Sequence, residues 1–347
     1  MIDTQTTPFE LNIAEQPDAL RHLADSASTE LGSLTARSWG RIVITGMGSS
    51  HYAGLSTWRR LIDLGHSAWV IDSGELLDNE ALITRETLLI VTSQSGASGE
   101  VVELLERRRQ GRISPALVVG VADDDDSPLA KAADLFLPLH SGPEATVSTK
   151  SYLNTLGVHR LLRAAFGAED TDQIPRHELY DAAAAVQTVI DSVDLTACAT
   201  TSGGRCIPNL AFIGAGDSAG TALFAALITK ESAKIDAEGY VGGQFRHGPF
   251  ELAGDGLTVM IFSPGRKTPD AGLRRLATDL LETGTHVVVV GDAGSDASSN
   301  VPIGGTTDLA FAAASSVVPQ LFAVDLARAN GVVPGAFVHG SKITSTI

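Results

Sequence analysis

The sequence predicts an α/β protein with two tandem doubly wound parallel sheets, each covered by helices on both faces. Short apolar runs of strand length alternate with longer helical patterns, which is typical of repeated βα units. The composition, with 44% hydrophobic residues, 5% aromatic residues and 35 glycines, suits helices packed closely on sheets. A length of 347 residues leaves room for about two domains.

Five apolar runs in the first half predict the strands of the first sheet. They span residues 41–46, 67–72, 86–94, 115–121 and 133–139. Helical periodicity around residues 17–31 precedes the first run. We therefore expect an N-terminal helix and then the first domain, together covering residues 1–194 and carrying the anion and sugar site.

The second half repeats the pattern of the first. Its apolar runs span residues 209–216, 257–265 and 285–292. The segment GMGSS at 46–50 aligns with GAGDS at 214–218 with an offset of 168, and Ser93 aligns with Ser263 with an offset of 170. Offsets that agree so closely indicate a duplicated domain. The second domain, with a C-terminal tail, is expected over residues 195–347.

The charge balance limits the partners that this chain can have. Lys and Arg number 25 against 41 Asp and Glu, for a net charge of −16. Nucleic acids and anionic membranes require basic surfaces, so we expect neither as a partner. A small anionic ligand would have to be held by backbone amides and hydroxyl groups, because the overall field repels it.

The cysteines and the N-terminus predict a reduced, cytoplasmic protein. Cys198 and Cys206 have the spacing of neither a disulfide framework nor a zinc site, and we expect no metal or other cofactor. Acids and prolines stand where a signal peptide would have a basic patch and an apolar run. No stretch approaches 18 consecutive apolar residues, so we expect no membrane span.

Hydroxyl-bearing residues follow three of the predicted strands. Ser49, Ser50 and His51 follow the first, at the start of a helical pattern that could bind an anion or simply be capped by serine. The segment TSQSGASGE at 92–100 opens another helix with four hydroxyls, whereas a cap uses only one. The segment TVSTK at 146–150 is the third; a polar helix start is its alternative reading.

Taken together, these segments resemble the SIS (sugar isomerase) domain family, in particular the isomerase half of glutamine–fructose-6-phosphate amidotransferase. Six segments match in order: 15–20 (EQPDAL), 48–50 (GSS), 93–96 (SQSG), 148–150 (STK), 242–249 (GGQFRHGP) and 342–344 (KIT). The resemblance implies tandem flavodoxin-like SIS domains and a homodimer with a shared active site. It also implies that an anionic sugar binds in the first domain.

The resemblance also implies roles for individual residues. Ser50, Ser93, Ser95 and Ser98 correspond to the family's phosphate ligands, and Gln94 and Ser148 to contacts with the anion or the sugar hydroxyls. Ser49, His51 and Arg246 complete the substrate-binding residues that we expect, the last two as candidates for discriminating between anions. Glu231 corresponds to the proton shuttle between C1 and C2. His247 corresponds to the ring-opening group from the neighbouring subunit, and Lys342 to the lysine that closes the site.

The residues themselves leave alternatives to these roles. Glu231 falls within an apolar helical stripe that includes Phe224 and Leu227, where burial would raise the pKa of a carboxyl group and suit a general base. The alternative for Glu231 is an ion pair with Lys234. His247 could be a structural histidine, and Lys342 a solvated surface residue.

The expected function is isomerisation of an aldose and a ketose, on a hexose with an anion at C6. The anion could be a 6-phosphate or the 6-sulfonate of sulfoquinovose. Phe224 and Ile228 stand where the amidotransferase has an acid and a lysine, and no glutaminase part is present, so handling of an amino group is in doubt. The alternatives are an aminosugar-6-phosphate deaminase or fructosamine-6-phosphate deglycase, and a non-catalytic sugar-phosphate sensor.

Overall fold

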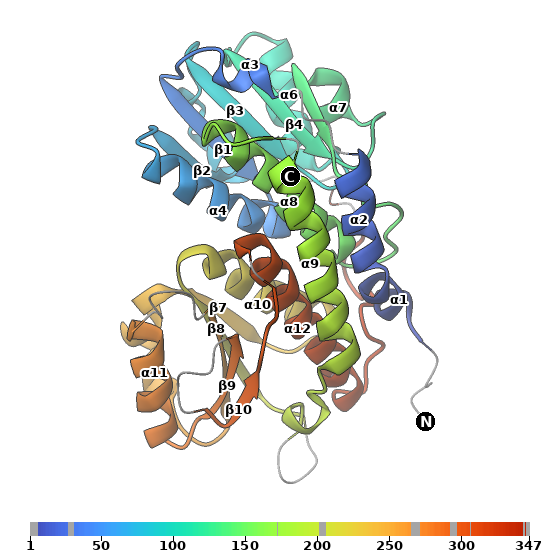
Figure 1. Cartoon of the computed structure of the whole chain (residues 1–347), viewed down its shortest axis with the longest axis vertical. Coiled ribbons are helices and arrows are strands. Elements are labelled where there is room, and N and C mark those ends of the chain that lie inside the picture. The colour runs from blue at the N-terminus through green and yellow to red at the C-terminus, as the bar shows by residue number, and fades with distance from the viewer. Residues whose placement is uncertain are drawn as a thin grey trace. The chain divides into compact units, whose positions relative to one another are not determined.

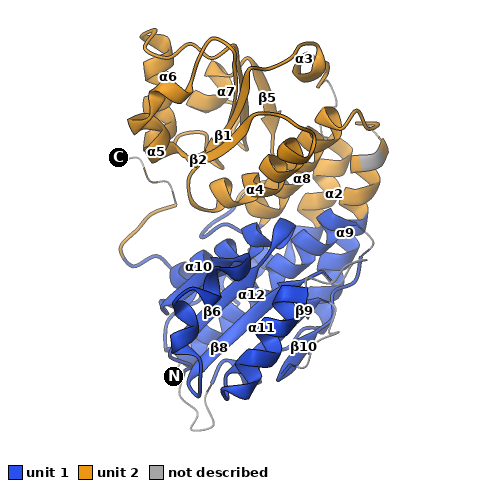
Figure 2. Cartoon of the chain, turned by 90° about the vertical axis from the view of Figure 1, so that its left-hand side faces the viewer, with its two compact units in different colours: residues 1–17, 144–149, 181–338 blue, residues 18–143, 150–180, 339–347 orange. Residues whose placement is uncertain are grey.

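A computed structural model describes most of the chain. The described residues are 6–26, 31–171, 173–200, 206–264, 271–291, 297–305, 307–342 and 344. They divide into two compact units, each assembled from separate segments (Figure 2). Unit 1 comprises residues 1–17, 144–149 and 181–338, and unit 2 comprises residues 18–143, 150–180 and 339–347. The predicted domain boundary at residue 194 remains a prediction.

Each unit contains a parallel sheet of five strands. In unit 2 the strand order is β2-β1-β3-β4-β5, and in unit 1 the order is β7-β6-β8-β9-β10 (Figure 1). The strands are β1 Arg41–Gly46, β2 Ala68–Asp72, β3 Thr87–Thr92, β4 Leu117–Ala122, β5 Leu135–Pro138, β6 Asn209–Gly214, β7 Ala237–Val241, β8 Leu257–Ser263, β9 His286–Gly291 and β10 Ser299–Val301. Two tandem doubly wound domains are therefore confirmed.

The helices connect the strands as βα units do. They are α1 Pro8–Ala14, α2 Gln16–Ser26, α3 Gly32–Thr35, α4 Gly48–Asp63, α5 Ser73–Asp78, α6 Gly99–Arg109, α7 Pro128–Ala132, α8 Lys150–Phe166, α9 Gln173–Ser192, α10 Ala219–Ala233, α11 Ala271–Glu282 and α12 Asp308–Ala329. Short 3-10 turns are η1 Glu80–Leu82, η2 Thr196–Cys198, η3 Gly216–Ser218, η4 Gly242–Arg246 and η5 Pro249–Leu252. Helix α2 confirms the helical periodicity that precedes the first strand.

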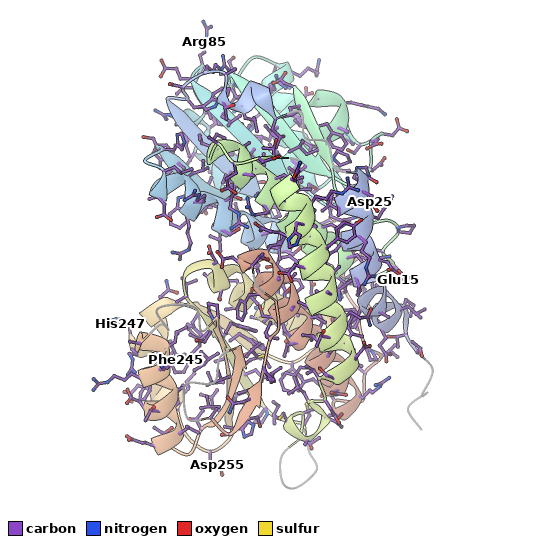
Figure 3. The ribbon with its side chains drawn as sticks, viewed as in Figure 1. Glu15, Asp25, Arg85, Phe245, His247 and Asp255 are labelled. Atoms are coloured by element: carbon purple, nitrogen blue, oxygen red, sulfur yellow. The ribbon has the colours of Figure 1, made fainter. Side chains whose placement is uncertain are left out.

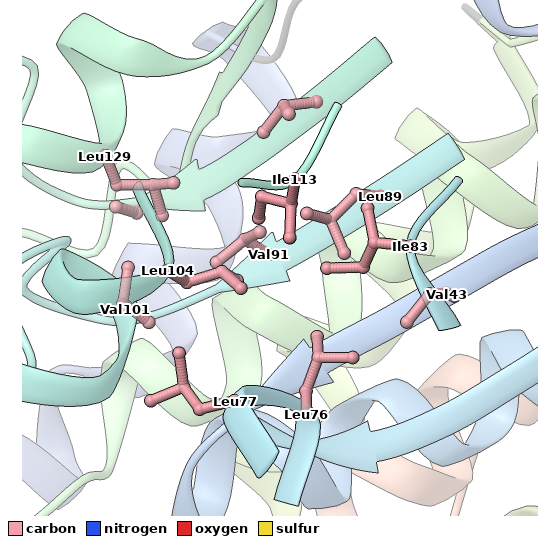
Figure 4. Packing of buried hydrophobic residues seen from close by; sticks show 12 residues of the cluster. Val43, Leu76, Leu77, Ile83, Leu89, Val91, Val101, Leu104, Ile113 and Leu129 are labelled. Carbon is pink, nitrogen blue, oxygen red and sulfur yellow. The ribbon is translucent and has the colours of Figure 1, made fainter. Parts of the chain in front are cut away.

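Packing against each sheet separates its helices into two layers. In unit 2, one face of the sheet packs against α5, α6 and α7 through a cluster that includes Leu76, Val101 and Leu129 (Figure 4). Helices α4 and α8 contact each other on the opposite face (Figure 2). In unit 1, α11 packs through Leu273 and Leu280 against β8 and β9, while α10 contacts α12. Burial of these apolar faces is what holds each three-layer unit together.

The two sheets confirm the internal duplication. Strands β1 and β6 begin at Arg41 and Asn209, and occupy the same place in the two strand orders. The structure adds β7 and β10, which the apolar pattern did not predict. Both are edge strands: β7 has partly exposed residues and includes exposed Glu238, and β10 has three residues. An edge strand buries less of its surface, so it carries no continuous apolar run.

Helix α12 is the described segment whose length and composition come nearest to those of a membrane span. Among the described residues, α12 alone is long and apolar enough, with a mean hydropathy of 1.6 in its best window. However, 83% of that window is buried inside the protein. Small residues such as Ala313, Ala314 and Ser316 let α12 pack closely in the core of unit 1. Its apolar composition is that of a buried core helix.

Candidate active site

The unit 2 sheet has its topological switch point between β1 and β3, at the carboxyl ends of these strands. The chain leaves β1 for β2 on one side and then crosses to β3 on the other side. Ligands of doubly wound sheets bind at such a point, outside the carboxyl ends of the two strands. Here these ends are Gly46 and Thr92, which pair in register.

The two segments that follow Gly46 and Thr92 contain most of the predicted substrate-binding residues. The first turn of α4 and the loop from β3 to α6 contain Ser49, Ser50, His51, Ser93, Gln94, Ser95 and Ser98. The fold therefore brings these seven residues to one edge of one sheet, although 40 or more positions separate the two groups in the sequence.

Gly46 allows the first turn of α4 to approach the end of β3. A Cβ atom on Gly46 would lie 2.7 Å from the Thr92 carbonyl oxygen and 3.2 Å from the His51 amide nitrogen. The first of these separations is shorter than Cβ contacts in proteins. A side chain here would push the segment with Ser50 away from the segment with Ser93, so the site depends on glycine at this position.

The loop after β3 is a compact turn that gathers hydroxyl groups. The Ser93 amide donates to the Val121 carbonyl at 2.9 Å, which extends the sheet by one residue. Its Oγ lies 3.2 Å from the Ser98 Oγ, and the Ser95 Oγ accepts from the Ala97 amide at 3.2 Å. Gly96, with φ of 62°, makes the turn possible. Hydroxyls arranged in this way at the start of α6 suit an anion without a basic side chain.

The C-terminal segment of unit 2 lies against the start of α6. The Gly99 amide, in the first turn of that helix, donates to the Thr344 carbonyl at 3.0 Å. Lys342, two residues earlier, is partly exposed, and Ile343 lies outside the described residues. The tail that was predicted to close the site is thus anchored beside the serine loop.

His51 is a neutral imidazole beside the end of β2. Burial lowers its pKa, and the opposing attraction of Asp72 and the Ile71 backbone does not compensate. Its Nδ1 atom is buried without a hydrogen-bond partner among the described residues, and its ring contacts Tyr52 edge-on. The ring therefore adds no charge beside the serine loop, and its Nδ1 atom has almost no exposed surface.

Glu231 lies near the C-terminal end of α10 in unit 1. Phe224 and Ile228 on the same helix are buried, whereas Glu231 is half-buried, so the predicted apolar stripe surrounds it only in part. The Lys234 ammonium donates to the main-chain carbonyls of Glu231 and, at 2.6 Å, of Ala336. Burial lowers the pKa of Lys234, and the charge of Glu231 opposes that change.

Arg246 is the last residue of η4 at the surface of unit 1, and His247 follows it. Phe245 points into the core, whereas the side chain of His247 is exposed (Figure 3). The Arg246 guanidinium pairs with Asp279 at 2.6 Å and lies over the Phe250 ring. Arg246 is therefore held on its own unit by a carboxylate, which neutralises part of the charge that it could offer to a substrate anion.

Ser148 is also in unit 1, in the segment that precedes α8. Its neighbour Thr149 donates from both amide and hydroxyl to the Glu144 carboxylate, at 2.7 and 2.8 Å. This capping contact fits the alternative reading of a polar helix start for Thr149. Ser148 itself is half-buried.

The predicted residues thus fall into two groups. Lys342 and the seven residues of the sheet edge belong to unit 2, and Ser148, Glu231, Arg246 and His247 belong to unit 1. Their assembly into one site remains a prediction. Within the described part of the chain, no three His, Cys, Asp or Glu side chains are placed to hold a metal ion.

Comparison of the sequence with known proteins shows that two regions of the chain match the same domain family. The SIS domain family matches residues 36–164 and 205–328. A glutamine–fructose-6-phosphate aminotransferase (isomerizing) from Corynebacterium diphtheriae is 26% identical over 358 residues. That alignment covers 93% of this chain and 55% of the relative, so the chain spans about half the length of the curated relatives it matches.

Three solved structures share the fold. The C-terminal domain of glucosamine-fructose-6-phosphate aminotransferase from Francisella tularensis has a TM-score of 0.82 and 20% identity, over 97% of this chain and 100% of that one. Tagatose-6-phosphate ketose/aldose isomerase from Escherichia coli has 0.76 and 21%, over 96% of each chain. Glucosamine-6-phosphate deaminase from Thermotoga maritima has 0.74 and 20%, over 97% and 99%.

The two family matches begin just before β1 and β6 and end within the long helices of the two halves, α8 and α12. Each match thus contains one of the two parallel sheets. The chain therefore belongs to the SIS domain family, and its tandem SIS domains resemble the isomerase half of glutamine–fructose-6-phosphate aminotransferase.

Proposed function

We propose that this protein is an aldose–ketose isomerase that acts on a hexose with an anion at C6. The observation that carries the proposal is the loop from Ser93 to Ser98, whose hydroxyls and helix start lie beside Ser50 at the switch point of the unit 2 sheet. Such a site binds a phosphate-like group through neutral donors, which suits a chain with a net charge of −16.

The proposed chemistry is proton transfer between C1 and C2 of the open-chain sugar. His247 would assist ring opening, Glu231 would take the proton from one carbon and return it to the other, and Lys342 would stabilise the enediolate oxygen. Each residue thus acts at a different atom of the sugar. The half-buried position of Glu231 supports its part, because the residue is held by α10 and still has exposed surface.

Phosphate and 6-sulfonate would both fit a cradle of hydroxyls. A sulfonate has nearly the same shape but one negative charge, and no cationic side chain of the serine loop selects the dianion. His51 is the residue proposed to discriminate between them. Because burial lowers its pKa, the ring adds no positive charge that would favour the dianion of a phosphate over a sulfonate. Arg246 is the other candidate, although Asp279 already neutralises part of its charge.

A second candidate is an aminosugar-6-phosphate deaminase or a fructosamine-6-phosphate deglycase. The observation that favours it is the match along 97% of this chain to a glucosamine-6-phosphate deaminase with a similar tandem arrangement. A sugar-phosphate sensor that binds without turnover is the third candidate. We further propose a cytoplasmic homodimer with a shared active site, without nucleic-acid or membrane partners.

A substrate panel in D2O separates these candidates. We expect one of glucose-6-phosphate, sulfoquinovose, glucosamine-6-phosphate or fructosamine-6-phosphate to be converted, with deuterium entering C2 of the aldose or C1 of the ketose in proton NMR spectra. Conversion of glucose-6-phosphate or sulfoquinovose, which contain no amino group, supports the isomerase. Release of ammonia or an amino acid identifies the second candidate, and binding without turnover of any compound supports the sensor.

The anion cradle is proposed for unit 2 alone, which predicts unequal effects of two serine substitutions. Ser95→Ala should raise the KM of the 6-anionic substrate by about tenfold, because one hydrogen bond to a charged group is lost. Ser263→Ala, at the end of β8 in the other sheet, is the matched control and should leave KM unchanged. The measurement is steady-state kinetics, with thermal unfolding to verify both folds. If Ser263→Ala raised KM and Ser95→Ala did not, the cradle would lie in unit 1 and the proposal would be wrong.

A further inference from the structure

A fully buried histidine lies behind the candidate anion cradle. His159, on α8, has no exposed surface. Its Nδ1 is 2.9 Å from the Thr57 hydroxyl, and its Nε2 is 3.2 Å from the Thr92 hydroxyl. Both ring nitrogens are therefore engaged with hydroxyl groups in the interior of unit 2.

The two threonines belong to the two elements that carry the candidate ligands. Thr57 is on α4, whose first turn contains Ser49 and Ser50. Thr92 is the last residue of β3 and directly precedes Ser93. One imidazole thus bonds the helix that follows the first strand to the strand that leads into the serine loop, in the interior of unit 2.

The hydroxyl contacts of His159 fit a neutral ring with one N–H group. The Thr57 hydroxyl is 3.3 Å from the His159 carbonyl oxygen, which can only accept. With the Thr57 proton on that carbonyl, Nδ1–H donates to the Thr57 oxygen, and Nε2 accepts from the Thr92 hydroxyl. Burial, together with the positive charge of Arg163, lowers the pKa of His159 to about 3, which keeps the ring neutral.

The corresponding long helix of unit 1 bonds differently. The buried Gln320 of α12 donates to the Gln16 side chain at 3.2 Å and to the Ser316 carbonyl at 3.0 Å. These bonds hold α12 to the start of α2 and to its own preceding turn. Gln320 thus makes no bond to a strand end of its own sheet among the contacts described, whereas His159 does.

We propose that His159 is a positioning residue for the C6 anion: it holds α4, through Thr57 in the middle of the helix, to the end of β3, and so supports the spacing of Ser50 from the Ser93–Ser98 loop. The inference rests on the proposed function of that loop. It predicts that His159 affects the affinity for the anionic group and has little effect on the chemistry at C1 and C2.

Two variants that break the same link should have the same kinetic effect. His159→Leu and Thr92→Val should each raise the KM of the 6-phosphate or 6-sulfonate substrate by about tenfold and change kcat by less than about threefold, the tenfold being the loss typical of one hydrogen bond. Thr92→Ser keeps the hydroxyl and should retain the wild-type KM. Because both substitutions remove one link, the double variant should be close to either single variant.

The control is Gln320→Leu, which removes an equally buried polar side chain in unit 1. It should lower the unfolding temperature as His159→Leu does, yet leave KM unchanged. If folded His159→Leu and Thr92→Val both keep the wild-type KM, or if Gln320→Leu raises KM equally, the positioning role is wrong. Absence of any binding of inorganic phosphate, glucose-6-phosphate or sulfoquinovose by the wild type would instead reject the proposed function of the loop.

A pH series tests the neutral arrangement of the ring. Between the ordinary histidine pKa of 6.5 and the native value of about 3, the unfolded chain binds a proton at His159 that the native chain does not. Acidification therefore destabilises the wild type but not His159→Leu at this position, and the gap between their unfolding temperatures should narrow from pH 7 to pH 4. A constant gap would show that the native ring accepts the proton and would overturn the arrangement.

Discussion

Glu231→Gln should abolish isomerisation while leaving substrate binding intact. The amide keeps the shape of the carboxylate but cannot accept the proton from C1 or C2, and loss of a general base lowers kcat by about 10²- to 10⁴-fold. We expect deuterium incorporation from D2O to be lost in parallel, since exchange and transfer share the same protonated carboxyl group. NMR of the substrate in D2O measures both quantities in one experiment.

The matched control for this substitution is Glu282→Gln. Glu282 is an exposed carboxylate at the end of α11 in the same unit, so its replacement changes the net charge equally. It should alter neither kcat nor deuterium incorporation. Deuterium incorporation that survives in Glu231→Gln would remove Glu231 from the mechanism, and unchanged ligand affinity would show that the variant is folded. The position of Glu231 on the well-packed helix α10 makes this isosteric exchange a mild one.

The parts of the fold predicted from the sequence are those with a continuous apolar signal. The central strands, such as β3 and β8, are buried along their whole length, and their runs of valine, leucine and isoleucine predicted them. The edge strands β7 and β10 have no such run, so only pairing with β6 and β9 defines them. Pairing between distant segments leaves no local trace in a single sequence.

In the candidate site too, the sequence predicted features that are local and missed contacts between distant segments. Serines in a loop at the end of a strand are visible in the sequence, because their number exceeds what a helix cap uses. The role of His159 was not visible, since a lone histidine within a helical pattern shows nothing of the Thr57 and Thr92 hydroxyls that meet it in the fold. The pairing of Arg246 with Asp279 was hidden for the same reason.

Mixing Glu231→Gln with His247→Ala should restore activity that neither variant has alone. In the proposed dimer each site takes its glutamate from one chain and its histidine from the other. A heterodimer of the two variants then has one site with both residues changed and one intact site. Random exchange of chains, of which half become heterodimers, should restore about a quarter of the wild-type activity. The side chain of His247 is exposed, as this arrangement requires.

The converse mixture tests the same arrangement from the opposite direction. A chain that carries both Glu231→Gln and His247→Ala, mixed equally with wild type, damages both sites of every heterodimer if the sites are shared. Only wild-type homodimers then remain active, so about a quarter of the activity is left, against about half if each chain builds its own site. Sharing therefore predicts a quarter in both mixtures. Unshared sites predict none in the first mixture and half in the second, so activity of verified heterodimers decides between the two arrangements.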